Sequence, residues 1–136
     1  MVNVMLEDAG NLSDFFSFDK ILLDAPCSGS GTDNVFKSNF TLELIEKSKK
    51  TQERLLRKAL KILKPGGEMV YSTCSILAKE NEEVVDKVLK EFKACLVPVD
   101  FGKEIECLPS GFKEVLVVAP NELFEGFFVA KIKKLK

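Results

Sequence analysis

The first stretch with residues suited to chemistry is Lys20–Thr32, KILLDAPCSGSGT. Its apolar run Ile21–Leu23 is typical of a strand in the parallel sheet of an α/β protein, where both faces of the strand are covered. Asp24 follows the run directly, and Cys27 comes three residues later in a turn of small residues. Pro26 restricts this turn, while the glycines permit a close approach to a ligand. Because ligands bind at the carboxyl ends of strands in open α/β sheets, this turn is a candidate functional site.

A second stretch, Lys64–Ser75, reads KPGGEMVYSTCS and has the same construction. Its Pro-Gly-Gly sequence is expected to end a helix and turn the chain, and Met69–Tyr71 then forms the next apolar strand. Cys74 follows at the carboxyl end of that strand. Since neighbouring parallel strands end at the same edge of a sheet, we predict that Asp24, Cys27 and Cys74 lie on one rim.

The composition indicates a single soluble domain. With 136 residues, 46% of them hydrophobic and 30% charged, the chain can build one core, and no apolar run reaches the length of a membrane span. No secretory signal is visible at the N-terminus, so we expect a cytoplasmic protein without membrane contact. The net charge of −1 gives no overall attraction to nucleic acid, which restricts any RNA contact to local patches.

The four cysteines are too far apart for a zinc ribbon, and the chain has no histidine. We therefore expect no metal site. Cys95 and Cys107 are interpreted as small buried hydrophobic residues, as is common for thiols in a cytosolic domain. Cys27 and Cys74 differ from them because both lie in polar turns of small residues.

Hydrophobic periodicity predicts the order strand, strand, helix, strand, helix and then further strands. One amphipathic helix begins at Thr41 and ends before Pro65, and Asn81–Phe92 forms a second. Leu12–Phe18 is expected to be a short helix or a loop. The expected strands are Met1–Leu6, Phe18–Asp24, Met69–Tyr71, Ala94–Val99, Glu114–Ala119 and Phe127–Ile132. No internal repeat or linker is visible, which favours one domain over residues 1–136.

These motifs resemble those of the NOL/NOP/Sun family of RNA (cytosine-5) methyltransferases. The resemblance rests on DAPCSGSGT, a helix, KPGG…YSTCS, Glu80-Asn81-Glu82 and the closing Gly126–Lys131, and it extends from Asp8 to the C-terminal strand. It implies the C-terminal half of a class I methyltransferase catalytic domain. The implied fold is α/β and partly Rossmann-like, with a mostly parallel sheet, an antiparallel C-terminal strand and the first strands of the family sheet missing. S-adenosylmethionine is the implied cofactor, and RNA, either tRNA or rRNA, is the implied substrate.

The resemblance also implies roles for individual residues. Cys74, in the family's TCS motif, is the implied nucleophile, which adds to carbon 6 of cytosine so that carbon 5 can take a methyl group. Asp24 is implied to hydrogen-bond the ring nitrogen of the base, and Cys27 to assist proton removal and release of the enzyme. Asp8 matches an acidic position that contacts the adenine of the cofactor. Asp24 and Pro26 are assigned to the same cofactor site.

Other interpretations of these residues stay open. Cys27 and Cys74 at adjacent strand ends can form a redox or disulfide pair, which makes a thiol redox module one alternative to the methyltransferase. Asp8 can serve only as a helix cap. Gly29–Thr32 can cradle a phosphate at a helix N-terminus, although the lysine of a P-loop is missing. A non-catalytic fragment or subunit that retains the fold is the main alternative.

Compared with the family, the chain lacks the region upstream of Asp8, which carries a Gly-rich loop, an acidic residue and a lysine near the catalytic centre. The resulting interpretation is an enzyme that needs this N-terminal half for full activity. Met1–Leu6 and Ile21–Leu23 also lose neighbours in the sheet. Because a bare apolar edge invites pairing, we expect that the N-terminal strand moves onto the exposed edge, or that a homodimer or a separately encoded N-terminal half covers it.

Overall fold

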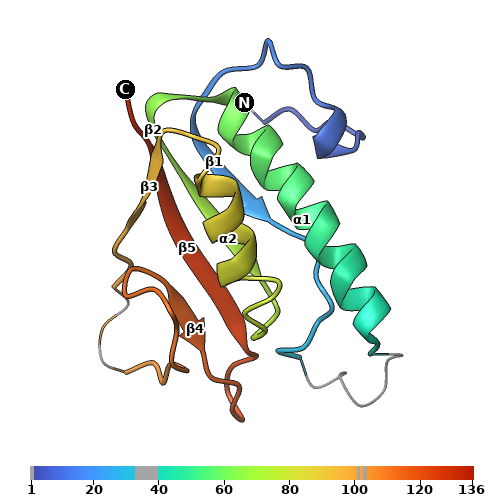
Figure 1. Ribbon diagram of the computed structural model, residues 1–136, viewed down its shortest axis with the longest axis vertical. Helices are drawn as coiled ribbons and strands as arrows, with labels where there is room; N and C mark the ends of the chain where they lie inside the picture. The colour runs from blue at the N-terminus through green and yellow to red at the C-terminus, as the bar shows by residue number, and fades with distance from the viewer. Residues whose placement is uncertain (1, 33–39, 101, 103) are drawn as a thin grey trace.

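The computed structural model describes residues 2–32, 40–100, 102 and 104–136, which form a five-stranded sheet with two α-helices packed against one face (Figure 1). In chain order the elements are η1 (Ala9–Asn11), β1 (Phe18–Asp24), α1 (Leu42–Ile62), β2 (Leu63–Thr73), α2 (Glu82–Leu89), β3 (Ala94–Val97), β4 (Leu116–Val118) and β5 (Phe127–Lys134). No helix in these described ranges is long and apolar enough to cross a bilayer.

The sheet has the order β1-β2-β5-β3, and β4 also pairs with β5. β1 runs parallel to β2, whereas β5 runs antiparallel to β2, β3 and β4. The strands other than β5 therefore all point the same way. This arrangement confirms the expected α/β fold with an antiparallel C-terminal strand.

Alternating side chains of the central strands build the core. On β2, Met69 and Tyr71 face the helices with 1% and 0% of their surface exposed, and Phe128 of β5 is equally buried. The rings of Tyr71 and Phe128 meet edge to face at 6.0 Å. Apolar residues of α1 and α2 complete this layer, namely Leu56, Ala59, Leu60, Val84, Val85 and Val88.

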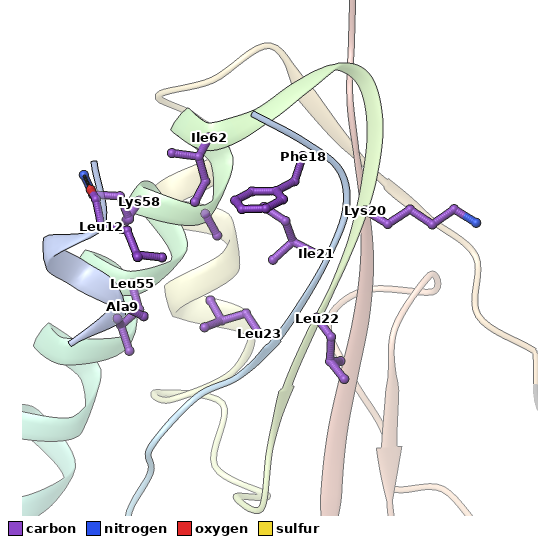
Figure 2. Close-up of a pocket in the computed structure, with 11 residues that line it drawn as sticks. Ala9, Leu12, Phe18, Lys20, Ile21, Leu22, Leu23, Leu55, Lys58 and Ile62 are labelled. Atoms are coloured by element: carbon purple, nitrogen blue, oxygen red, sulfur yellow. Dashed lines mark hydrogen bonds between the residues drawn. The ribbon is translucent and has the colours of Figure 1, made fainter. Parts of the chain in front are cut away.

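β1 alternates in the same way, and one of its two faces is open. Phe18, Ile21 and Leu23 point toward α1 in Figure 2, while Lys20 and Leu22 point to the opposite side. Leu22 is 74% exposed. The expectation that both faces of this strand are covered is therefore wrong for the described residues, because both α-helices lie on one face of the sheet.

Side chains hydrogen-bond to free backbone groups at both ends of α1. Thr41 caps the N-terminus by accepting a hydrogen bond from the backbone N–H of Leu44 at 3.2 Å. At the other end, the ammonium group of Lys134 donates to the carbonyl oxygens of Leu60 at 2.7 Å and Leu63 at 2.8 Å. The helix ends at Ile62, before Pro65 as expected, and the Pro-Gly-Gly sequence lies within the range of β2.

The predicted N-terminal strand Met1–Leu6 is wrong. Residues 2–6 form no strand, and Val2, Val4 and Leu6 are almost fully exposed. A strand needs a neighbour for its backbone hydrogen bonds, and this segment pairs with no strand of the described structure. It also does not move onto β1, whose outer edge carries no strand in the described ranges. The segment between η1 and β1 is a loop.

The expected burial of Cys95 and Cys107 is also wrong, because both thiols are free and exposed. Cys95 lies on β3, where the flanking Ala94 and Leu96 pack against the core. Because neighbouring side chains alternate along a strand, Cys95 points to the open face. Cys107 lies in a bridge to Val118 outside the main strands.

Candidate active site at the ends of β1 and β2

Parallel pairing of β1 and β2 sets the position of Asp24. The register places Asp24 beside Ser72, and the hydroxyl of Ser72 donates to Oδ1 of Asp24 at 2.8 Å. The ladder continues one residue further, where the N–H of Ala25 donates to the carbonyl of Ser72 at 2.9 Å. Asp24 itself is exposed, so its carboxylate is held at the rim of the sheet and is open to a ligand.

The loop after β1 folds back over the end of β2 and brings two thiols into contact. Gly29 has a φ of +75°, which favours glycine, and the N–H of Gly31 donates to the carbonyl of Cys74 at 2.9 Å. The sulfur atoms of Cys27 and Cys74 lie 3.0 Å apart. Both thiols are free and half-buried. The structure thus brings together the cysteines from the two stretches identified in the sequence.

The environment of Cys27 favours its protonated form. Burial raises the pKa of the Cys27 thiol from 9.0 to about 12, and the neighbouring sulfur of Cys74 and the negative charge of Glu80 act in the same direction. Cys27 therefore keeps its proton at neutral pH. The sulfurs of Cys27 and Cys74 are within hydrogen-bond distance, and either thiol can be the donor.

Glu80 lies beneath both cysteine loops and is fully buried. Its carboxylate accepts hydrogen bonds from the backbone N–H of Ser28 at 2.7 Å, the hydroxyl of Ser28 at 2.5 Å and the hydroxyl of Ser75 at 2.7 Å. Sequence reasoning included Glu80 only as part of the family resemblance and gave it no role. The signal in the sequence that could have pointed to Glu80 is its position a few residues after the TCS motif.

The neighbouring Asn81 holds the other side of the turn after β2. Its Oδ1 accepts from the hydroxyl of Thr73 at 2.6 Å, and its Nδ2 donates to the carbonyl of Ser75 at 2.7 Å. All three residues are fully buried. The backbone on both sides of Cys74 is therefore fixed by side-chain hydrogen bonds.

A third loop, which precedes β5, closes against the loop after β1. The N–H of Gly126 donates to the carbonyl of Gly31 at 2.7 Å. A Cβ atom at Gly31 would lie 2.1 Å from the carbonyl oxygen of Gly126, so neither backbone leaves room for a side chain. A Cβ atom at Gly126 would lie 2.5 Å from a methyl group of Ile76. The rim is thus built from three interlocked loops.

Asp8 does not join this rim. Its carboxylate caps η1 by accepting from the N–H of Gly10 at 2.8 Å, and it pairs with Arg54 of α1 at 3.0 Å. These two contacts hold the pKa of Asp8 below its usual value. The structure therefore places Asp8 against α1, apart from the Asp24, Cys27 and Cys74 cluster.

Pro26 is exposed between Asp24 and Cys27, and its carbonyl is held by Gln52 of α1 at 2.9 Å. The family resemblance assigns Asp24 and Pro26 to the cofactor site, and both are exposed at the carboxyl end of β1. Asp8 is the third assigned residue, and both its carboxylate oxygens already have protein partners. Two of the three assigned residues, Asp24 and Pro26, are therefore accessible to a ligand.

A parallel pair of strands that carries an acid and two thiols at its carboxyl ends, with an antiparallel last strand, defines a part of an α/β S-adenosylmethionine-dependent methyltransferase. The model of the family described as 16S rRNA methyltransferase RsmB/F matches residues 1–133. The chain belongs to this family of RNA methyltransferases.

Individual relatives agree with this assignment. The chain is 41% identical over 128 residues to ribosomal RNA small subunit methyltransferase F of Aeromonas salmonicida, a match that covers 87% of this chain and 26% of the relative. It is 39% identical over 127 residues to the protein of the same name from Vibrio vulnificus, covering 88% and 26%. The chain thus spans about a quarter of the length of these curated relatives.

Two solved structures from Pyrococcus horikoshii are also similar. NSun6 with SFG superimposes with a TM-score of 0.87 and 34% identity, covering 98% of this chain and 35% of that protein. A methyltransferase homolog protein superimposes with a TM-score of 0.74 and 42% identity, covering 88% and 40%. Both comparisons place the chain within part of a longer methyltransferase.

Proposed function

We propose that this chain carries the nucleophile and the base-binding rim of an RNA cytosine-5 methyltransferase and that Cys74 is the nucleophile. The observation that supports this most directly is the 3.0 Å contact between the sulfurs of Cys27 and Cys74, which follow the ends of β1 and β2, the strand pair whose carboxyl end also carries the exposed Asp24. The match of the chain to an rRNA methyltransferase family supports RNA as the substrate.

The proposed chemistry starts from the low reactivity of carbon 5 of cytosine. Addition of the Cys74 thiolate to carbon 6 moves electron density to carbon 5, which then acts as a nucleophile. S-adenosylmethionine, when bound, supplies an electrophilic methyl group. Asp24 hydrogen-bonds the ring nitrogen through a proton that lies between the two groups, and this proton stabilises the negative charge that develops in the ring. The hydrogen bond from Ser72 to Asp24 holds the carboxylate in place for this contact.

Cys27 is proposed to remove the proton from carbon 5, so that the bond between Cys74 and carbon 6 can break. This role requires that Cys27 first lose its own proton. Because the pKa of Cys27 is raised to about 12, the step should accelerate as the pH rises above neutral. The base must also leave its stack to reach the two thiols, which favours single-stranded or loop regions of rRNA or tRNA as targets.

Covalent trapping tests this proposal. RNA that carries 5-fluorocytidine cannot lose a proton from carbon 5, so the adduct with the nucleophile should accumulate. The assay uses a small-subunit rRNA transcript, S-adenosylmethionine and the chain with the N-terminal region that relatives contain. We expect an adduct on Cys74 that disappears in Cys74→Ser and persists in the matched control Cys95→Ser, which changes an exposed thiol elsewhere.

The same experiment separates the roles of the two thiols. With ordinary RNA, Cys27→Ser should accumulate an adduct that the parent chain resolves, because release is blocked. An adduct that survives Cys74→Ser, or that maps to Cys27, would contradict the assignment of the nucleophile. No adduct under any of these conditions would favour the non-catalytic alternative.

The 3.0 Å contact also favours a second candidate, a thiol redox module. Such a module would form a reversible disulfide between Cys27 and Cys74 and would leave 5-fluorocytidine RNA unmodified. A calorimetric titration with S-adenosylmethionine separates the two candidates, since only the methyltransferase should bind it.

A further inference from the structure

Glu80 occupies a position that suits a structural organiser of the two thiols. Ser28 directly follows Cys27 in the chain, and Ser75 directly follows Cys74. Both serines donate hydrogen bonds to the one carboxylate of Glu80. Glu80 therefore binds the residue that directly follows each cysteine, Ser28 after Cys27 and Ser75 after Cys74.

The Glu80 side chain is also out of reach of any ligand. Glu80 is 0% exposed, so it cannot touch a substrate or a cofactor. A buried carboxylate is costly unless donors surround it, and here three donors converge on its two oxygens. The hydroxyl of Tyr71 also donates to the carbonyl of Glu80 at 3.0 Å, which ties this residue to the centre of β2.

The hydroxyl groups around Glu80 have one consistent orientation. A carboxylate only accepts, so the single proton of the Ser75 hydroxyl points to Glu80. In the 2.8 Å contact between the hydroxyls of Ser30 and Ser75, Ser30 must then be the donor. Ser30 in turn accepts from the N–H of Ile76 at 3.0 Å. The loop after β1 and the loop after β2 are thus connected through one ordered chain of hydrogen bonds that ends on Glu80.

We propose that Glu80 is a positioning residue that sets the distance between the sulfurs of Cys27 and Cys74 by binding both loops at once. The relevance of Glu80 to RNA methylation rests on the proposed function. Its effect on the distance between the two sulfurs does not depend on that function. Without the carboxylate, the two loops keep their backbone contact between Gly31 and Cys74 and lose the hydrogen bonds of both serines to Glu80.

The separation of the thiols can be measured without RNA. In a Cys95→Ser, Cys107→Ser background, only Cys27 and Cys74 remain, and their dithiol reacts with oxidised glutathione to give one protein disulfide and two reduced glutathione molecules. The equilibrium position yields the effective concentration of one thiol at the other. We expect Glu80→Ala to lower this effective concentration by about tenfold or more, because proximity effects are lost steeply with misplacement.

Two conservative variants make the test specific to geometry. Glu80→Gln can still accept from the Ser28 N–H and can donate to serine hydroxyls that rotate, so it should retain most of the effective concentration. Glu80→Asp keeps the charge but is shorter by one methylene and should behave like Glu80→Ala. Equal loss in Glu80→Gln and Glu80→Ala would overturn the geometric explanation in favour of a charge effect.

Control variants exclude a general loss of stability. Val88→Ala removes side-chain atoms of a fully buried residue of α2, and Glu82→Ala removes a neighbouring acid that binds Ser110. Both should leave the effective concentration unchanged while the chain stays folded. If Glu80→Ala does not fold, Ser75→Ala removes one of the hydrogen bonds to Glu80 and should still lower the effective concentration. An unchanged value in folded Glu80→Ala or in folded Ser75→Ala would overturn the proposal.

The result of the thiol measurement is independent of the proposed function. A lowered effective concentration without any RNA adduct would support the positioning role and contradict the methyltransferase activity. An RNA adduct with unchanged effective concentration in Glu80→Ala would support the activity and contradict the positioning role.

Discussion

At the scale of single residues, two cysteines that look equivalent in sequence have different environments. Cys27 is partly buried near the negative charge of Glu80, and these surroundings raise its pKa to about 12. Cys74 lies in contact with Cys27, with the two sulfurs 3.0 Å apart. The raised pKa makes Cys27 the poorer nucleophile at neutral pH, which agrees with the proposal that Cys74 forms the adduct.

The first prediction concerns the labelling of Cys27. A pKa raised from 9.0 to about 12 lowers the thiolate fraction by about a thousandfold, and the greater nucleophilicity of a more basic thiolate recovers part of this loss. Iodoacetamide should therefore label Cys27 about thirtyfold more slowly in the folded chain than in urea. Peptide mass spectrometry gives the rate for each thiol, and the exposed Cys95 should differ little between the two states.

The pH dependence separates this effect from simple shielding. The labelling rate of Cys27 in the folded chain should keep rising by about tenfold per pH unit between about pH 8 and pH 11, because the pKa is not yet reached. A rate that levels off near about pH 9 would show an ordinary thiol pKa behind a steric barrier.

At the scale of elements, the rim depends on loops that approach more closely than side chains permit. Gly31 and Gly126 meet backbone to backbone, and the turn after β2 packs against both. The strands place Asp24 and Cys74 in register, but these loops decide whether the thiols touch.

We predict that Gly31→Ala destabilises the chain. The added Cβ would lie 2.1 Å from the carbonyl oxygen of Gly126, so one loop must move. The free energy of unfolding in urea should fall by about 2 kcal/mol or more. Gly111→Ala is the matched control, because a Cβ there meets nothing within 4 Å, and it should change the value by less than about 0.5 kcal/mol. Equal effects of the two changes would contradict the close approach of the loops.

A second prediction at this scale concerns the end of α1. Lys134 of β5 donates to the carbonyls of Leu60 and Leu63, which lie at the C-terminal end of the helix. Lys134→Met should therefore cost about 1 kcal/mol of unfolding free energy through loss of these bonds and of the favourable helix-end charge. Lys133→Met changes an exposed neighbour and should cost little. A larger cost for Lys133→Met would refute the capping role.

The elements that the sequence predicts well are those with a strong local pattern. β1, α1 and β5 follow from apolar runs and helical spacing, and the common rim of Asp24, Cys27 and Cys74 follows from the parallel order of β1 and β2. Met1–Leu6 has a strand pattern but pairs with no strand in the described chain. Glu80 was missed because its role depends on how two distant loops meet.

At the scale of the whole molecule, the outer edge of β1 carries no neighbouring strand in the described ranges. An apolar groove of about 260 Å³ runs along this edge between β1, α1 and the η1 region (Figure 2). Leu22 is 74% exposed on the opposite side of the strand. Since the chain spans about a quarter of the length of its curated relatives, we propose that the preceding region of such proteins covers this edge and that a second copy covers it in the isolated chain.

The last prediction tests this coverage by solution mass. In sedimentation, the isolated chain should show a mass above that of one copy that rises with concentration. Leu22→Lys places a charge beside the free edge and should shift the population to single chains, because charged side chains oppose strand pairing. The folded chain should tolerate the change, with less than about 0.5 kcal/mol lost, since Leu22 is 74% exposed. Leu42→Lys changes an equally exposed leucine, 73% accessible at the start of α1, and should leave the association unchanged. A single-chain mass at every concentration would mean that the β1 edge is stable without a partner. Equal effects of the two lysine variants would mean that the contact between copies does not involve β1.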